Sequence, residues 1–75
     1  MPKYLDVRVT RFGREMLTNA GAEEREGGLV VTTNQSQRLQ KGALYAISMP
    51  REEIGAGHCG AYTFVGRKGS SYFFV

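Results

Sequence analysis

The chain combines a length of 75 residues with a single cysteine, Cys59, and this combination limits its fold more than any other feature. A domain of this size buries only about 60% of the surface that its unfolded chain exposes, so its stability is small unless something reinforces it. A lone cysteine has no partner within the chain, which excludes the disulfide framework of small secreted scaffolds. We therefore expect one domain over residues 1–75, in a reducing, cytoplasmic compartment, with self-association into a homo-oligomer as the available reinforcement.

No segment is apolar enough for a signal peptide or a membrane-spanning helix. Lys3, Asp6 and Arg8 place charges where a signal peptide needs an uninterrupted apolar core. The longest apolar run, Ala43 to Ile47, is far shorter than the roughly 20 residues that a spanning helix requires. The sequence therefore predicts neither secretion nor a membrane partner.

Glycine is the compositional outlier and favours strands joined by turns. The chain has 10 glycines, about 13% of its residues, against a usual content of about 7%. Residues 3–10 alternate between apolar and polar side chains, with Leu5, Val7 and Val9 on one side, which predicts a half-buried strand. Residues 29–33 and 43–49 predict two further strands from their β-branched content and alternation.

Two segments predict short helices, and a third is ambiguous. Phe12, Met16, Leu17 and Ala20 have helical spacing, and Gly21 follows as a stop signal, which predicts a helix over residues 14–20. Residues 50–54 begin with proline followed by acids, the chemistry of a helix start. The polar residues 34–41 fit either one helical turn capped at residue 36 or a long hairpin loop.

The C-terminus predicts a β-hairpin with aromatic residues on one face. Residues 61–65 and 71–75 flank a three-residue loop, Arg67 to Gly69, and this loop pairs Phe64 with Tyr72. The predicted fold is therefore a single α+β domain, an antiparallel sheet of four or five short strands with one or two short helices on one face and a C-terminal hairpin. The other hairpin face carries Val65, Phe73 and Val75, so a helix, a partner or a second copy must cover it.

The chain shows no arrangement of residues that supports catalysis. Residues 55–60 match the GxGxxG dinucleotide pattern, but a strand follows them where the cofactor fold requires a helix. His58 and Cys59 are the only residues of their types, and neighbours in extended chain point to opposite faces. They also provide only two of the four ligands of a structural zinc ion. We expect a non-enzymatic protein with no cofactor, no metal and no catalytic residues.

Charge and aromatic content point to a binding function. The formal net charge is +3, and seven of the ten basic residues are arginine, which suits interfaces because its planar group binds carboxylates and phosphates. In size, charge and glycine-rich strand pattern the chain resembles many accessory proteins of phages and mobile elements, an analogy that rests on no motif. The candidate binding residues are the aromatic residues of the hairpin, the two cations of its loop and two arginines in or next to the first predicted strand. They are Tyr62, Phe64, Tyr72, Phe74, Arg67, Lys68, Arg8 and Arg11.

Two functions use these residues. The first is a protein-binding module, an inhibitor or adaptor that docks on a larger protein or nucleoprotein assembly, because tyrosine, phenylalanine and arginine are favoured interface anchors. The alternative is direct binding of DNA or RNA, with Arg67 and Lys68 on phosphates and rings stacked on bases. In so small a domain, one face of the hairpin must also contribute to the core. Substitution of Phe64 or Tyr72 by alanine distinguishes the two roles, because loss of a core ring unfolds the protein, whereas loss of an interface ring weakens binding of the partner.

Overall fold

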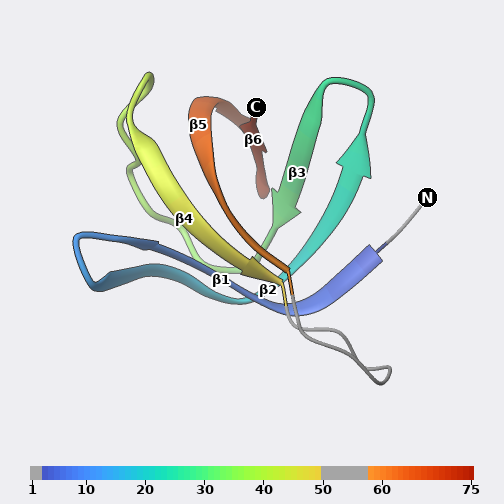
Figure 1. Ribbon diagram of the computed structural model, residues 1–75, viewed down its shortest axis with the longest axis horizontal. Helices are drawn as coiled ribbons and strands as arrows, with labels where there is room; N and C mark the ends of the chain where they lie inside the picture. Colours follow the sequence, from blue (N-terminus) through green and yellow to red (C-terminus); the bar gives the residue numbers. More distant parts are fainter. Residues whose placement is uncertain (1–2, 50–57) are drawn as a thin grey trace.

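The strands of the protein form a closed barrel. The computed structural model describes residues 3–49 and 58–75, and these contain no helix. All neighbouring strands are antiparallel, in the order β1-β2-β3-β6-β5-β4, and β4 pairs with β1 to close the barrel (Figure 1). The six strands are β1 (Lys3–Arg11), β2 (Arg14–Arg25), β3 (Gly28–Thr32), β4 (Leu44–Met49), β5 (His58–Lys68) and β6 (Ser71–Phe74). The predicted α+β class with helices on one sheet face is therefore wrong.

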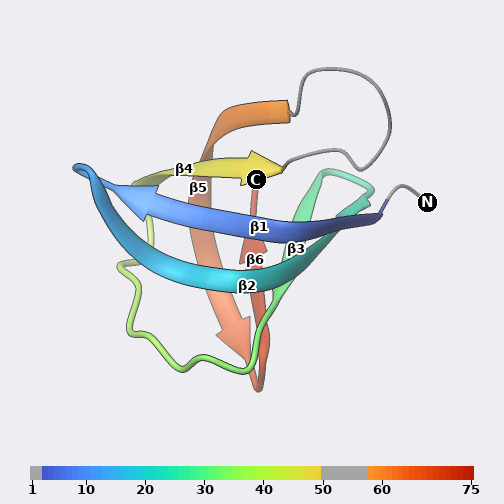
Figure 2. The same cartoon turned by 90° about the horizontal axis from the view of Figure 1, so that it is seen from below.

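Closure of the barrel buries the hairpin face of Phe64, Tyr72 and Phe74, whereas the opposite face, for which the sequence predicts a cover, stays on the outside with Val65 and Val75 exposed. β1, β2 and β3 follow one another as hairpins, and residues 33–43 then cross to β4, which places β4 beside β1 in a Greek-key arrangement. Figure 2 shows β1 and β2 crossing in front of β5 and β6, so that the inner faces of the strands pack on one another. Closure gives every strand a neighbour on both sides, although residues 14–20 of β2 pair with β1 alone.

The core consists of the inward-facing residues of all six strands together with Leu39 and Ala43 of the segment between β3 and β4, and aromatic rings fill its centre. The rings of Phe64 and Phe74 have centroids 5.4 Å apart, and Tyr45 lies edge-on to both, at 6.4 and 6.1 Å. Such tilted and edge-to-face pairs are the favoured geometry for aromatic side chains. The largest side chains with almost no exposure are Tyr72, Phe74, Leu17, Leu29, Ile47, Val7, Val9 and Val31.

The predicted helix over residues 14–20 is wrong, because this segment is the first half of β2. Between the pairs Val7–Ala20 and Val9–Leu17, β1 advances by two residues and β2 by three, which marks a β-bulge in β2. The extra residue changes the spacing of buried side chains from two to three, so Leu17 and Ala20 are both buried. A bulged strand thereby reproduces the spacing of a helical face.

A second bulge corrects the predicted inner face of β1. Val7 and Val9 are buried as predicted, but Leu5 is 56% exposed. Between Tyr4 and Val7, β1 advances by three residues while β2 advances by two, and Asp6 in this bulge has a φ of 55°. The extra residue reverses the alternation at this point, so Leu5 faces outward.

The C-terminal hairpin is confirmed, but its loop and register differ from the prediction. Lys68 pairs with Ser71, which leaves a two-residue turn, and Phe64 pairs with Phe74 instead of Tyr72. A bulge between Phe64 and Gly66 accommodates the shift. Because the partner of Phe64 differs by two residues, the aromatic side chains keep the same face, and that face is the barrel interior.

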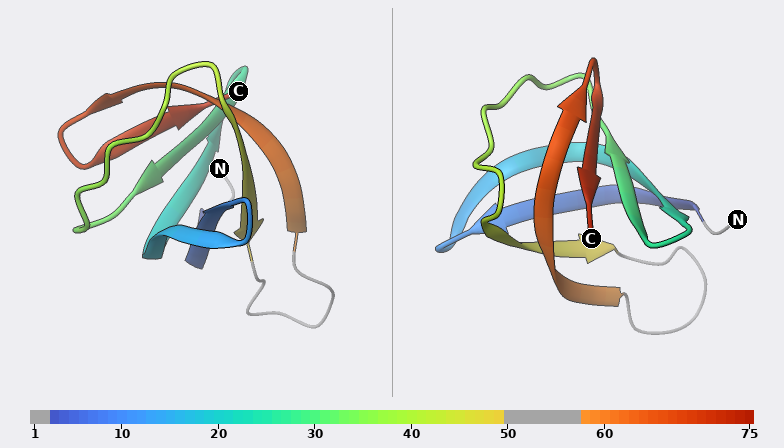
Figure 3. Two further views of the ribbon diagram at one scale, coloured as in Figure 1. Left: turned by 90° about the vertical axis from the view of Figure 1, so that its left-hand side faces the viewer. Right: turned by 90° about the horizontal axis from the view of Figure 1, so that it is seen from above.

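Residues 33–43 form an extended connection with a turn near its end, so residue 36 caps no helix. The segment is a loop, but it is not the predicted hairpin loop, because β3 and β4 do not pair. Figure 3 shows this connection running beside the β5–β6 hairpin, and Thr33 N donates to Ser70 O at 3.2 Å. The predicted helical turn over residues 50–54 and the first half of the GxGxxG segment, residues 55–57, lie outside the described residues. Within the described ranges, no helix of the length and apolarity needed to cross a membrane occurs.

Candidate functional site

The connection between β3 and β4 lies across one end of the barrel, and two core tyrosines fix it there. The Tyr72 hydroxyl accepts a hydrogen bond from Gln37 N at 3.0 Å, and the Tyr45 hydroxyl accepts one from Gln40 N at 2.8 Å. Leu39 lies between these two anchors and is 8% exposed, so it seals the barrel end. The core phenols therefore determine the path of a polar segment that carries Arg38 and Lys41 on the surface.

Arg67 joins the β5–β6 hairpin to the same connection. Its Nε donates to Gly69 O at 2.7 Å, and its Nη1 lies 3.5 Å from Gln37 O. The guanidinium carbon is 5.0 Å from the centre of the Tyr72 ring, within the range of a cation–π contact. These contacts hold the Arg67 side chain in place, so its positive charge is positioned before any ligand arrives.

A groove of about 400 Å³ separates the connection from the hairpin, and it is lined by three cations. Arg38 and Lys41 contribute from one side and Arg67 from the other. Its remaining lining residues are Ser36, Gln37, Leu39 and Phe64, and none is acidic. An uncompensated group of three positive charges in a concave site favours an anionic ligand.

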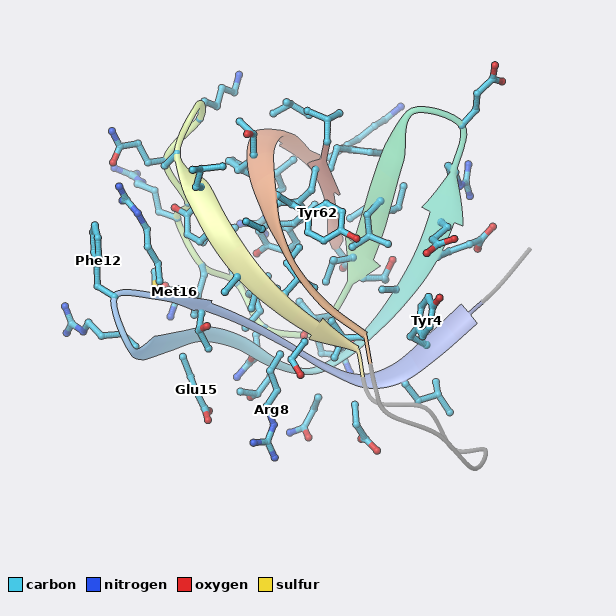
Figure 4. The ribbon with its side chains drawn as sticks, viewed as in Figure 1. Tyr4, Arg8, Phe12, Glu15, Met16 and Tyr62 are labelled. Carbon is cyan, nitrogen blue, oxygen red and sulfur yellow. The ribbon has the colours of Figure 1, made fainter. Side chains whose placement is uncertain are left out.

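The tip of the β1–β2 hairpin extends this positive surface. Arg11 Nη1 donates to the side-chain oxygen of Gln40 at 3.2 Å, which connects the tip to the β3–β4 connection. Arg14 pairs with Arg11 across the hairpin. Phe12, between them, is 87% exposed and lies at the end of the hairpin (Figure 4).

We call this surface the basic end of the barrel. Its six cations come from three separate segments, and Glu15 is the one acidic residue among the described parts of those segments. Glu23 and Glu24 of β2 lie away from it, because Arg11 pairs with Arg14 at one end of the β1–β2 hairpin and Lys3 pairs with Glu23 at the other. The cations of the basic end are Arg11, Arg14, Arg38, Lys41, Arg67 and Lys68.

The structure separates the residues that the sequence grouped as one aromatic binding face. Phe64, Tyr72 and Phe74 lie in the barrel core, at 3%, 0% and 1% exposure. Arg11, Arg67 and Lys68 belong to the basic end. Arg8 lies on the outer wall, in a shallow depression with Asp6, Asn19 and Ser48, and points away from the barrel in Figure 4.

Phe12, like Leu5, is exposed where the sequence pattern indicated a buried side chain. Its position in the helical spacing of residues 12–20 indicated core packing, whereas it is the most exposed large apolar side chain among the described residues. The available signal was Gly13, which marks a turn when it stands between two alternating segments.

Tyr62 is half-buried and lies near Tyr4 and Glu24, away from the basic end. Burial raises the pKa of Tyr62 above its ordinary value of about 10, and the negative charge of Glu24 and the phenol of Tyr4 raise it further. Tyr4 donates a hydrogen bond to Glu24 Oε1 at 3.2 Å. The fourth candidate ring therefore belongs to a polar cluster at the other end of β2.

The raised pKa of Tyr62 predicts a pH dependence of stability. The folded protein favours the neutral phenol, so this contribution is complete below about pH 10 and is lost as the pH rises through the folded-state pKa. We expect Tyr62→Phe to reduce the fall in the free energy of unfolding above pH 10. Urea unfolding at several alkaline pH values measures this, and an unchanged fall in the variant would contradict the assignment.

The described residues contain no group of three or more histidine, cysteine, aspartate or glutamate side chains able to hold a metal ion. The fold and the site together define a small antiparallel barrel with one strongly basic end. Comparison with known proteins adds no family to this description, since no family model, no curated protein sequence and no solved structure matches the chain.

Proposed function

We propose that the protein is a non-enzymatic nucleic-acid-binding protein and that its basic end contacts the phosphate backbone. The observation that carries this proposal is the groove in which Arg38, Lys41 and Arg67 meet with no acidic side chain in its lining, and to which Arg11 is joined by its hydrogen bond with Gln40. Lysine and arginine contacts to phosphates release counterions and supply most of the affinity in sequence-independent binding. This is the alternative function of the sequence analysis, with a different set of residues.

The groove at the basic end supports contacts with phosphates. Arg38, Lys41 and Arg67 are all exposed, and Arg67 is in addition held by contacts with Gly69 and Tyr72, which lowers the entropic cost of fixing its charge. A fixed arginine fork combined with exposed cations suits the tetrahedral phosphate group, which accepts hydrogen bonds from several directions. The positive field of the groove also steers an anionic polymer toward it.

Charge reversal in the groove tests the proposal. In fluorescence anisotropy with labelled single- and double-stranded DNA and RNA, we expect Arg38→Glu combined with Lys41→Glu to bind at least about tenfold more weakly. The slope of log affinity against log salt should become shallower by about 2, because two phosphate contacts are lost. These positions are preferred to Arg67, whose replacement also removes contacts within the fold.

The matched control is Arg8→Glu combined with Arg25→Glu. Both double variants have a formal net charge of −1, since two reversals subtract four charges from +3. The weak surface pair of Arg25 with Glu23, at 3.7 Å, contributes little to stability, and thermal unfolding verifies that each variant folds. Equal loss in the two variants would show that net charge alone is responsible. Wild-type protein that binds no nucleic acid at low salt would overturn the proposal.

A second candidate, docking on a larger protein as an inhibitor or adaptor, rests on a different observation. Val65 and Val75 are 46% and 58% exposed on the outer wall, and with Val30 and Phe73 they line one shallow depression over β3, β6 and β5. An apolar outer strip of this kind fits a protein surface or a second copy of the chain. Absence of nucleic-acid binding in the experiment above would make this strip the primary binding surface.

A further inference from the structure

The turn between β1 and β2 contains Phe12, a residue type that is unfavourable in the backbone conformation of this turn. Arg11 pairs with Arg14, which leaves Phe12 and Gly13 as a two-residue turn. Their φ angles are 54° and 74°, so both residues are left-handed, as in the type I′ turns that select asparagine, aspartate or glycine. A bulky aromatic residue in this region is unusual and carries backbone strain.

The strain is not offset by burial of the ring. Phe12 is 87% exposed, and it is not among the residues that pack in or against the barrel core. Figure 4 shows its ring projecting from the end of the hairpin, beyond the strands. A strained and solvent-exposed aromatic residue costs stability, and positions of this kind are found where a ligand uses the side chain.

Contacts around Phe12 place its ring within the basic end. The Arg11 guanidinium carbon lies 4.7 Å from the centre of the Phe12 ring, and Arg11 also donates to Gln40, next to the groove residue Lys41. One ring face therefore meets a cation, and the high exposure of the residue leaves the remaining ring surface open to solvent. An accessible aromatic surface beside arginines and lysines is the combination by which proteins hold unpaired bases and their phosphates.

We propose that Phe12 stacks on an unpaired base and that the ligand of the basic end is single-stranded DNA or RNA. This inference rests on the proposed nucleic-acid binding and specifies its ligand. Arg11 and Arg14 flank the ring and neutralise the adjacent phosphates, while the groove of Arg38, Lys41 and Arg67 continues the path of the backbone. A stacked base must be unpaired or splayed from its neighbours, so the ring distinguishes single strands from an intact duplex.

Phe12→Asn removes the ring and retains the turn, because asparagine favours the left-handed region. In anisotropy measurements with a labelled oligodeoxyadenylate, we expect the affinity of Phe12→Asn to fall by about 5- to 100-fold, the effect of losing one stacked base. Its affinity for the same strand in a duplex, and its salt slope, should equal those of the wild type, since all cations remain. Phe12→Tyr should bind within about twofold of the wild type, because tyrosine stacks equally well.

Leu5→Thr is the matched control, because Leu5 is also an exposed apolar residue, at 56%, and lies outside the basic end. Its affinities should be those of the wild type. Thermal unfolding should show Phe12→Asn to be at least as stable as the wild type, which excludes unfolding as the cause of weaker binding. A 2-aminopurine base in the oligonucleotide adds a direct signal, whose fluorescence should change on binding to wild type and Phe12→Tyr but not on binding to Phe12→Asn.

The outcomes separate the two proposals. Wild-type protein that binds neither single strands nor duplex would overturn nucleic-acid binding, and base stacking with it. Binding by the wild type with an unaltered single-strand affinity in Phe12→Asn would overturn the stacking role alone. An equal loss for single strands and duplex would also overturn it, since the ring would then contribute without recognising an unpaired base.

Discussion

Tyr72→Ala should leave the protein unfolded or close to unfolding at room temperature. Tyr72 is fully buried, its ring centre lies 6.2 Å from that of Phe64, and its hydroxyl accepts a hydrogen bond from Gln37 N. Loss of a buried aromatic side chain costs about 3–5 kcal/mol, which approaches the whole stability of a small domain. Tyr72→Phe retains the ring and should cost only about 1–2 kcal/mol for the hydroxyl and its partners.

Urea unfolding followed by far-ultraviolet circular dichroism measures both Tyr72 variants. Tyr4→Ala is the control, because Tyr4 is half-buried at the other end of the barrel and makes one side-chain hydrogen bond, to Glu24. It should be clearly less destabilising than Tyr72→Ala. A Tyr72→Ala protein whose free energy of unfolding lies within about 1 kcal/mol of the wild-type value would contradict the core position of this ring. If such a protein also failed to bind a partner, Tyr72 would again be interpreted as an interface anchor.

Gly28→Ala should destabilise the barrel, whereas Gly21→Ala should be tolerated. An added Cβ at Gly28 meets the carbonyl oxygen of Phe74 on the neighbouring strand, at a separation that requires backbone movement. Gly28 begins β3, whose pairing with β6 closes the barrel, so we expect a cost of about 1–3 kcal/mol or more. At Gly21 the nearest atom to an added Cβ is Tyr4 O, at 3.7 Å, an ordinary contact.

Thermal and urea unfolding of the two alanine variants measure this difference. Alanine in a strand restricts the unfolded chain more than glycine, so Gly21→Ala should be neutral or slightly stabilising, by up to about 1 kcal/mol. Amide exchange of the β3 and β6 residues in Gly28→Ala should show faster exchange than in wild type, since their pairing is disturbed. Equal stabilities for the two variants would show that the strands separate without cost at Gly28.

Sequence patterns predicted the strands that pair regularly and failed where bulges occur. Residues 44–49 alternate without interruption and form β4 as predicted, with Tyr45 and Ile47 on the buried face. In β2 the bulge near Asn19 changes the spacing of buried residues, and that spacing was interpreted as a helix. Closure of the barrel depends on the β1–β4 and β3–β6 pairs, which join residues distant in sequence. Such pairs produce no recognisable pattern among neighbouring residues, so the sequence did not predict the barrel.

The candidate site could be predicted only in part, for a related reason. Arg11, Arg67 and Lys68 were among the predicted binding residues, but Arg14, Arg38 and Lys41 were not, because only the fold brings their segments together. The hairpin aromatics have the composition of an interface, yet barrel closure turns three of their rings inward. Phe12 was misassigned because turn preferences favour other residues at its position, and selection for function can override them.

The segregation of charge along the barrel gives the molecule an electric dipole. Six cations lie at the basic end, whereas Glu23, Glu24 and Glu26 lie at the β2–β3 hairpin. A dipole of this kind orients a small protein during diffusion, so it meets a polyanion with its basic end first, and association is faster at low ionic strength. In the binding that we propose, the acidic hairpin of the bound molecule points away from the polyanion, so we expect the protein to coat one strand without crosslinking it to another.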